Sequence, residues 1–376
     1  MTITASDGEK FSQATFTLTV NNVAPTTVWD ERDPKSVWES DGTNYGFQFK
    51  VTEPGEDTTS PNVSCGSRGT VAGVWQTWSV SSPDSGYVRT YNLECRFADG
   101  PASSTISASA TDSDGATGNT ATMTAQVENH LPTATLNAPT SINEGGTATV
   151  TFTNQNDVQA DRNAGFRYAF ACNGASLDGA TYDNSGTGTS TTCAYGDNGP
   201  MTDKGTPSPY TVRARIIDKD DGFTEYTKNI TVNNVAPTAT LEAPNPVRQG
   251  DNFTVSLTNV FDPSSADRQS LTYAFDCGDG SGYGAATGQA SRSCLALDKP
   301  TMTIKGKVMD KDGGVNEYTR EISVNNIAPT GTVKINNNAA ATNSRTVNLA
   351  LSATDPLPGS GVGHMRFRNE NTDTWS

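Results

Sequence analysis

The sequence predicts an all-β chain, a tandem array of small two-sheet β-sandwiches. Three observations predict this class: one polar heptapeptide recurs along the chain, apolar and polar residues alternate in most segments, and acidic Asp-Gly turns separate those segments. Alternation with a period of two is typical of antiparallel strands with one wet face, and no segment shows a sustained helical period. About seven such strands per hundred residues predict a sandwich of two sheets.

The heptapeptide at 232–238 reads Val-Asn-Asn-Val-Ala-Pro-Thr, and it recurs from Val20 and, with one change, from Val324. A degenerate copy begins at Val127, so successive spacings are 127−20 = 107, 232−127 = 105 and 324−232 = 92 residues. Spacings of about 100 residues match whole domains rather than solenoid repeats. The predicted parts are the closing hairpin of an incomplete domain (1–22), three full repeats (23–130, 131–235 and 236–327) and the first part of a further domain (328–376).

Composition and charge narrow the class of function. The chain has 376 residues and a formal net charge of −15. An acidic surface repels phosphate groups, which argues against nucleic acid as a partner and against docking on an anionic membrane. The chain contains no run of 18 apolar residues and no signal-peptide pattern, so we expect no membrane insertion in this segment.

Each full repeat contains two of the six cysteines. The pairs are Cys65 and Cys95, Cys172 and Cys193, and Cys277 and Cys294. Two cysteines per domain predict one disulfide in each repeat and an oxidising, extracellular or cell-surface location. The alternative is buried free thiols. A zinc site is disfavoured because no Cys-x-x-Cys or neighbouring histidine supplies four ligands.

Every repeat is expected to close with a strand, a tight acidic turn and a second strand. The expected closing strands are 16–20, 106–110 and 123–127, 210–216 and 229–232, and 302–308 and 321–324. Further strands are expected at 45–51, 148–152, 166–172, 253–257, 271–277, 347–351 and 365–367, with loops at 53–61 and 355–361.

One of these strands carries a family resemblance. Residues 273–280 read Tyr-Ala-Phe-Asp-Cys-Gly-Asp-Gly. This segment resembles the Tyr-x-Trp-Asp-Phe-Gly-Asp-Gly strand end of the polycystic kidney disease (PKD) domain family, with Phe275 for Trp and Cys277 for Phe. The second repeat keeps only part of the motif, at 168–174. The resemblance covers residues 1–330 with decreasing fidelity toward the first full repeat, and 331–376 resemble another bacterial immunoglobulin-like module.

The resemblance implies PKD-type immunoglobulin-like β-sandwiches, a role in extracellular adhesion, spacing or display, and no catalytic residues. The two cysteines of each repeat replace a core aromatic and a histidine of the family. The resemblance therefore implies that each pair crosslinks neighbouring strands across the core.

The acidic turns are candidate calcium-binding sites. The sequence suggests no other cofactor, and we expect that no cofactor is required. Calcium prefers several oxygen ligands, which the turns and the linker residues Asn233 and Asn234 would supply. The candidate carboxylates are Asp112, Asp114, Asp218, Asp220, Asp221, Asp310 and Asp312. The alternative is an ordinary hairpin turn, in which Asp and Gly are favoured for local hydrogen bonds and positive φ.

Two further kinds of site are suggested by the first and later repeats. Trp75 and Trp78, with Tyr87 and Tyr91 nearby, predict an aromatic carbohydrate platform, and the alternative is that they fill the core. Three Asn-x-Ser/Thr triplets are candidate glycosylation sites, although a Thr-rich chain produces such triplets by chance. Their asparagines are Asn62, Asn229 and Asn252.

The sequence predicts no enzyme, because no catalytic motif is present and the carboxylates sit in repeated turns. We expect an extracellular structural or adhesive repeat protein that forms a semi-rigid stalk or filament. Its partners would be like subunits or flanking immunoglobulin-like domains, and surface glycans or proteins. The alternative is a substrate- or carbohydrate-binding accessory region of a secreted hydrolase. The two incomplete ends are expected to be boundaries within a larger protein, or else ends that complement one another by strand addition between subunits.

Overall fold

The computed structural model describes residues 1–82, 86–200 and 207–366. Contacts between Cα atoms group the chain into two compact units. Unit 1 comprises Met1–Asn137, Val150–Thr191 and Thr211–Lys228, and unit 2 comprises Ala138–Thr149, Thr192–Tyr210 and Asn229–Ser376. The division passes through the second repeat, so it does not follow the predicted repeat boundaries, which stay a prediction.

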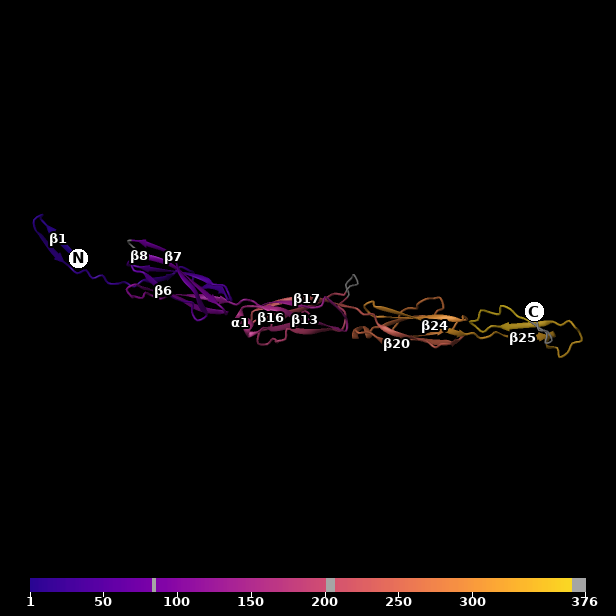
Figure 1. Ribbon diagram of the computed structural model, residues 1–376. Helices are drawn as coiled ribbons and strands as arrows, with labels where there is room; N and C mark the ends of the chain where they lie inside the picture. The colour runs from indigo at the N-terminus through magenta and orange to yellow at the C-terminus, as the bar shows by residue number, and fades with distance from the viewer. Residues whose placement is uncertain (83–85, 201–206, 367–376) are drawn as a thin grey trace. The chain divides into compact units, whose positions relative to one another are not determined.

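The first full repeat, in unit 1, is a sandwich of two four-stranded sheets, ordered β3–β5–β8–β7 and β4–β10–β9–β6. The strands are β3 (Thr26–Trp29), β4 (Lys35–Trp38), β5 (Tyr45–Glu53), β6 (Thr59–Ser64), β7 (Gly69–Ser82), β8 (Gly86–Phe97), β9 (Ala102–Asp112) and β10 (Ala121–Glu128). The long strands β7 and β8 lie side by side (Figure 1). Phe47 of β5, Leu93 of β8 and Ile106 of β9 are fully buried in one cluster, so both sheets share one core.

The second repeat has a three-stranded sheet, β11–β13–β15, and a four-stranded sheet, β12–β17–β16–β14. The strands are β11 (Thr133–Asn137), β12 (Ser141–Asn143), β13 (Gly146–Asn156), β14 (Arg167–Ala171), β15 (Ser190–Tyr195), β16 (Tyr210–Ile217) and β17 (Phe223–Asn233). A short helix, α1 (Gln159–Ala164), follows β13. The short strand β12 pairs in parallel with β17, just as β4 pairs in parallel with β10 in the first repeat.

The third repeat, in unit 2, has the same arrangement, with sheets β18–β20–β22 and β19–β24–β23–β21. The strands are β18 (Thr238–Glu242), β19 (Val247–Arg248), β20 (Asn252–Phe261), β21 (Thr272–Asp276), β22 (Ser291–Leu295), β23 (Thr301–Met309) and β24 (Val315–Asn325). A short helix, α2 (Ser265–Arg268), follows β20. Val255, Ile304 and Ile322 are fully buried in one core cluster. The chain is therefore an all-β tandem array of immunoglobulin-like sandwiches, as predicted.

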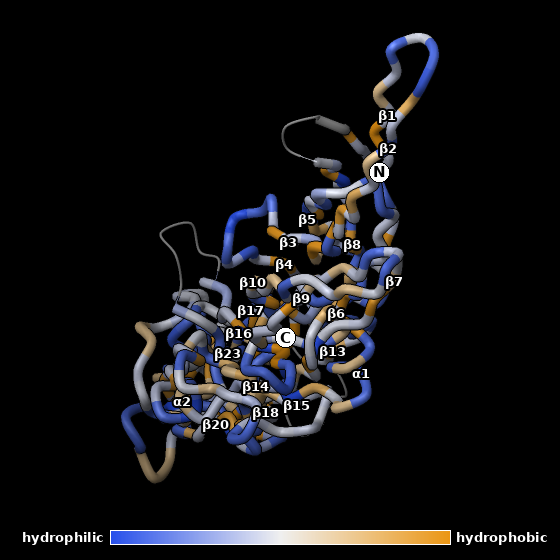
Figure 2. Tube along the Cα trace, turned by 90° about the vertical axis from the view of Figure 1, so that its left-hand side faces the viewer, coloured by the Kyte–Doolittle hydropathy of each residue, from blue (hydrophilic) through white to orange (hydrophobic). Residues whose placement is uncertain are grey.

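Each end of the chain carries a two-stranded sheet. In unit 1, β1 (Thr2–Ser6) pairs with β2 (Phe11–Thr15), and every residue of both strands is exposed. The loop between them, 7–10, is hydrophilic and appears blue in Figure 2. In unit 2, β25 (Thr330–Ile335) pairs with β26 (Leu349–Thr354), and a 3-10 helix, η1 (Asn336–Asn338), follows β25.

Several local predictions are wrong. Residues 16–20 form no strand and are exposed, because the hairpin register pairs Thr2 with Thr15 and ends before the alternating segment. The expected loop at 53–61 ends in strand β6, whose Pro61 is accommodated because β6 is an edge strand. Of the strand expected at 365–367, the first two residues are irregular and Phe367 lies outside the described residues. The helices α1 and α2 were not expected, since each is too short to show a helical period.

Two disulfides tie the two sheets of a sandwich together. Cys65, which follows β6, is bonded to Cys95 of β8. Cys277, which follows β21, is bonded to Cys294 of β22. Cys172 and Cys193 are disulfide-bonded as well, and no described cysteine is free. The prediction of disulfides is confirmed, and disulfides fit an oxidising location.

Candidate functional site

The linker asparagines hold the acidic turns. In each of three linkers, the side-chain Nδ2 of an asparagine donates to Oδ2 of the first aspartate of an acidic turn. The pairs are Asn22 with Asp112 at 2.9 Å, Asn129 with Asp218 at 2.9 Å, and Asn234 with Asp310 at 3.1 Å. The other oxygen, Oδ1, of each aspartate accepts two backbone N–H groups of its own turn. In each of these three carboxylates, Oδ1 therefore stabilises the turn and Oδ2 binds the linker.

A buried glutamate holds two of the linkers by their backbone. Glu39 accepts from His130 N at 2.8 Å, and Glu144 accepts from Val235 N at 2.7 Å. Their second oxygens accept from backbone N–H groups of Gly100 and Asn198. Glu39 and Glu144 are only 1% and 3% exposed.

The third repeat has a glutamine at the same place. The spacings are 144−39 = 105 and 249−144 = 105 residues. Gln249 Oε1 accepts from Ile327 N at 2.8 Å, which is the same linker contact. The third repeat therefore keeps the hydrogen bond to the linker but has no negative charge at this position.

Beside each glutamate lie two further buried carboxylates. One carboxylate oxygen from each of Glu39, Asp157 and Asp161 lies within 4.8 Å of the other two. The same holds in unit 2 for Glu144, Asp262 and Asp267. We call these the unit 1 triad and the unit 2 triad. All six residues are buried, and the segments that end β13 and β20 and open α1 and α2 supply the aspartates.

One oxygen of each triad aspartate, Oδ2, has no hydrogen-bond donor. Asp157 Oδ1 accepts from Val158 N at 2.8 Å and Asp262 Oδ1 accepts from Ser264 N at 2.8 Å, but Oδ2 of each is buried without a partner. Oδ1 of Asp161 lies 2.9 Å from Lys219 Nζ and Oδ1 of Asp267 lies 2.8 Å from Lys311 Nζ, whereas Oδ2 of each is buried without a partner. Both of these side chains are 0% exposed.

Beside each triad, a lysine from the next acidic turn pairs with three carboxylates, of which one belongs to the triad. Lys219 Nζ lies 2.6 Å from Asp99, 2.9 Å from Asp161, and also contacts Asp220. Lys311 Nζ repeats this with Asp197 at 3.1 Å, Asp267 at 2.8 Å, and Asp312. Burial lowers the pKa of each lysine, but the hydrogen bonds to three carboxylates outweigh it, so both pKa values lie above the ordinary value.

Burial raises the pKa of the triad carboxyls. It raises the pKa of Glu39 and of Glu144 to about 7, against hydrogen bonds from backbone N–H groups that lower it. It also raises the pKa of Asp157 to about 6, and it raises the pKa values of Asp161 and Asp267. Taking carboxylates out of water disfavours their charged form, so the charged triads need a compensating cation or a proton.

A surface groove lies beside the unit 1 triad. A groove lined by Ser40, Asp41, His130, Asn156 and Arg162 also touches Glu39 and Asp157. Across this groove, Arg162 pairs with Asp41 at 2.8 Å. The groove therefore lies next to two of the three triad residues, whose side chains are themselves buried.

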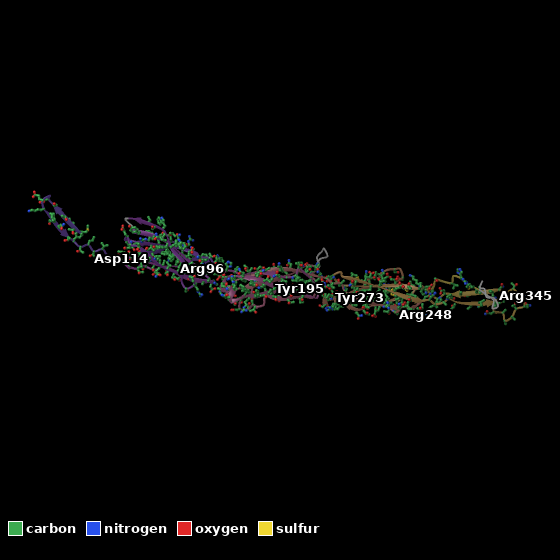
Figure 3. The ribbon with its side chains drawn as sticks, viewed as in Figure 1. Arg96, Asp114, Tyr195, Arg248, Tyr273 and Arg345 are labelled. Carbon is green, nitrogen blue, oxygen red and sulfur yellow. A yellow bond between two sulfur atoms is a disulfide. The ribbon has the colours of Figure 1, made fainter. Side chains whose placement is uncertain are left out.

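The predicted calcium ligands fall into three groups. Asp112, Asp218 and Asp310 hold the turns and linkers as described above. Asp220 and Asp312 belong to the lysine sets. Asp114 is exposed in the turn after β9 (Figure 3), and Asp221 Oδ1 accepts from Tyr182 N at 2.7 Å. Of the linker residues, Asn233 is exposed at the end of β17, and Asn234 Oδ1 is buried without a partner.

The predicted aromatic platform lies on β7. Trp75 pairs with Asn92 and Trp78 pairs with Thr90, because a β-bulge between Gln76 and Trp78 shifts the register by one residue. Positions 90 and 92 share one face of β8, so the bulge brings both indoles to that face. Trp75 is 45% exposed and Trp78 is 58% exposed. The predicted companion Tyr91 lies on the opposite, core-facing side of β8, at 5% exposure.

The predicted glycosylation sites are all on strands and exposed. Asn62 lies on β6, Asn229 on β17 and Asn252 on β20. Among the described residues, no helix has the length and apolar character needed to cross a membrane.

Sequence reasoning missed the triads, although it named neighbours of them. A signal was present: Glu39, Glu144 and Gln249 are spaced by 105 residues and are isolated acidic or amide residues after a short strand. The aspartates gave a comparable signal, since 262−157 = 105 residues and Ala-Asp-Arg recurs at 160–162 and 266–268. Only the folded chain brings them against Glu39.

Comparisons with known proteins give no family. No protein-family model matches the chain, and no curated protein matches it. Among solved structures, the native conformation of Escherichia coli α-2-macroglobulin matches with 12% identity and a TM-score of 0.23, covering 84% of this chain and 24% of that one. Dimeric latent PorU from Porphyromonas gingivalis matches with 11% identity and a TM-score of 0.19, covering 80% and 34%. The chain thus spans about a quarter and a third of their lengths. The resemblance to PKD domains stays a prediction.

Proposed function

We propose that the chain is a non-enzymatic spacer of an extracellular or surface protein, in which successive immunoglobulin-like repeats are held by their linkers. One observation carries this: the same linker N–H is bound by Glu39, Glu144 and Gln249 in three successive repeats. Repeated contacts of one kind fit a structural role better than a single reactive centre. The partners in this role are flanking immunoglobulin-like domains of the same protein, or like subunits in a filament.

Limited proteolysis of the full chain tests the spacer role. The linkers around Asn129 and Asn234 should resist cleavage in the wild-type chain, because their backbone and side chains are hydrogen-bonded. Asn129→Ala and Asn234→Ala each remove one such bond, worth about 1–2 kcal/mol, so cleavage at that linker should rise about 5- to 30-fold. Asn173→Ala, an exposed change outside the linkers, is the control. Linkers cut in the wild-type chain as fast as in a free peptide would contradict the proposal.

A second candidate function, carbohydrate binding, is favoured by the bulge in β7. A strand without a bulge would place Trp75 and Trp78 on opposite faces, because their separation is odd. The shift places two exposed indoles on one sheet face, beside the polar Asn92. Flat aromatic surfaces with a neighbouring amide are suited to the apolar face and the hydroxyls of a sugar.

Affinity electrophoresis of the full chain in gels containing soluble polysaccharides tests this candidate. Trp75→Ala and Trp78→Ala should each weaken retardation about tenfold, equivalent to about 1.4 kcal/mol. Trp38→Ala is the matched control, since Trp38 is 53% exposed but lies on β4 in the other sheet. Retardation that all three variants share with the wild-type chain would exclude this face as the binding surface.

A further inference from the structure

The two triads gather buried negative charge that the lysines Lys219 and Lys311 neutralise only in part. We propose that each triad binds one calcium ion. The ligands in unit 1 are Glu39, Asp157 and Asp161, and those in unit 2 are Glu144, Asp262 and Asp267. The inference deepens the proposed spacer role and rests on it, because each triad includes the glutamate that binds a linker.

The geometry of the triads suits one ion each. Three carboxylate oxygens, one from each residue, lie within 4.8 Å of one another. Calcium–oxygen distances are about 2.3–2.6 Å, so oxygens on opposite sides of an ion are about 5 Å apart. One ion can therefore contact all three side chains. The ligands are all carboxylates, without cysteine or histidine, and such a set selects a hard cation rather than zinc.

The unpartnered oxygens are a second, independent indication. Asp161 and Asp267 are completely buried, and Oδ2 of each has no hydrogen-bond donor, while Oδ1 of each lies within 2.9 Å of a lysine Nζ. Oδ2 of Asp157 and of Asp262 is buried without a donor, while Oδ1 of each is held by a backbone N–H. A buried carboxylate is ordinarily satisfied by donors or by a cation. The backbone thus orients an oxygen that no protein group then binds.

The lysines beside the triads do not neutralise all of the triad carboxylates. Lys219 pairs with Asp161, but its other partners are Asp99 and Asp220, outside the triad. Of the described residues, no lysine or arginine lies within ion-pair distance of Glu39 or Asp157. Unit 2 repeats this, with Lys311 paired to Asp267 but not to Glu144 or Asp262. Two carboxylates of each triad therefore have no cationic side chain beside them among the described residues.

The third repeat predicts how many ions are bound. Gln249 keeps the linker hydrogen bond but has no charge. Among the described residues, no third set of this kind surrounds Gln249. We therefore expect two calcium ions per chain.

Isothermal titration calorimetry of the full chain, stripped with a chelator and titrated with calcium chloride, tests the proposal. The expected result is two sites with dissociation constants on the order of 10⁻⁴–10⁻³ M, as in extracellular calcium modules. Asp157→Asn and Asp262→Asn keep the backbone hydrogen bond at Oδ1 and replace the unpartnered oxygen by nitrogen. Each should bind one ion, and the double variant none.

Asp114→Asn is the charge-matched control, because it removes a carboxylate from an exposed acidic turn, and it should still bind two ions. No binding up to about 10 mM calcium, or binding that both triad variants retain in full, would overturn the proposal. The wild-type titration decides the first point even if a variant does not fold. If the chain binds no calcium but its linkers resist protease, the calcium sites are refuted and the proposed spacer role stands.

Discussion

Glu144 Oε1 accepts a hydrogen bond from Val235 N at 2.7 Å, across 91 residues of sequence. This contact joins the end of β12 to the linker that follows β17, while Oε2 holds Asn198 N at 3.1 Å. One buried side chain thus fixes both the linker and a loop of its own repeat.

Glu144→Ala should lower the stability of the metal-free chain by about 2–3 kcal/mol, because it leaves two backbone N–H groups without an acceptor. Glu144→Gln should cost less, because Gln249 shows that a glutamine makes the same linker bond. Differential scanning calorimetry of the full chain in chelator measures both. An alanine variant as stable as the glutamine variant would contradict this account of the linker.

Lys311→Met should destabilise the metal-free chain by about 2 kcal/mol, because the buried Asp267 loses the ammonium 2.8 Å away. The lysine itself is partly exposed, which keeps the effect below that of a fully buried pair. Lys305→Met is the control, since the Lys305–Glu317 pair is exposed and 3.8 Å apart. Urea unfolding of both variants should show a loss for the first and almost none for the second.

The metal-free chain should lose stability as pH rises from about 5 to 7. The pKa of Glu144 is raised from 4.5 to about 7 in the fold, so the folded chain binds this proton more tightly than the unfolded chain does. The contribution is therefore favourable below pH 4.5 and is lost as pH rises toward 7, at about 1.4 kcal/mol per pH unit and per group. Asp262 and Asp267 face Glu144, and their pKa values are raised in the same direction.

Comparison of the wild-type chain with Glu144→Gln isolates this group. The difference in unfolding free energy between pH 5 and pH 7.5 should be smaller in the variant, since it has no carboxyl to titrate. Equal pH dependence in both chains would show that Glu144 does not titrate with a raised pKa.

Removal of the Cys277–Cys294 disulfide by a double change to alanine should destabilise the third repeat by about 3 kcal/mol. The two cysteines are 17 residues apart, and a crosslink of that span restricts the unfolded chain by roughly this amount. Calorimetry of the unreduced double variant measures the shift of its transition. The disulfide between Cys65 and Cys95 is intact in this variant, so the transition of the first repeat should be unchanged.

The sandwiches could be predicted because their signal is local. Phe47, Phe49 and Val51 alternate with polar residues along β5, and all three are fully buried. The turn aspartates, such as Asp218, are visible for the same reason, since the backbone N–H groups that Oδ1 accepts lie within four residues.

The triads could not be predicted because their signal is not local. Asp161 lies in a helix too short to show a helical period. It lies close to Glu39 only in the folded chain, because the two residues belong to different repeats. The bulge that turns Trp75 and Trp78 to one face is likewise a property of strand pairing, which the sequence of β7 alone does not specify.

Hydrogen exchange of the linker amides tests the central claim most directly. The backbone N–H groups of His130, Val235 and Ile327 are bound by Glu39, Glu144 and Gln249, so in the metal-free full chain all three should exchange far more slowly than in an unstructured peptide. Exchange at all three amides at the peptide rate would show that the linkers are not held by these side chains, and it would contradict the central claim.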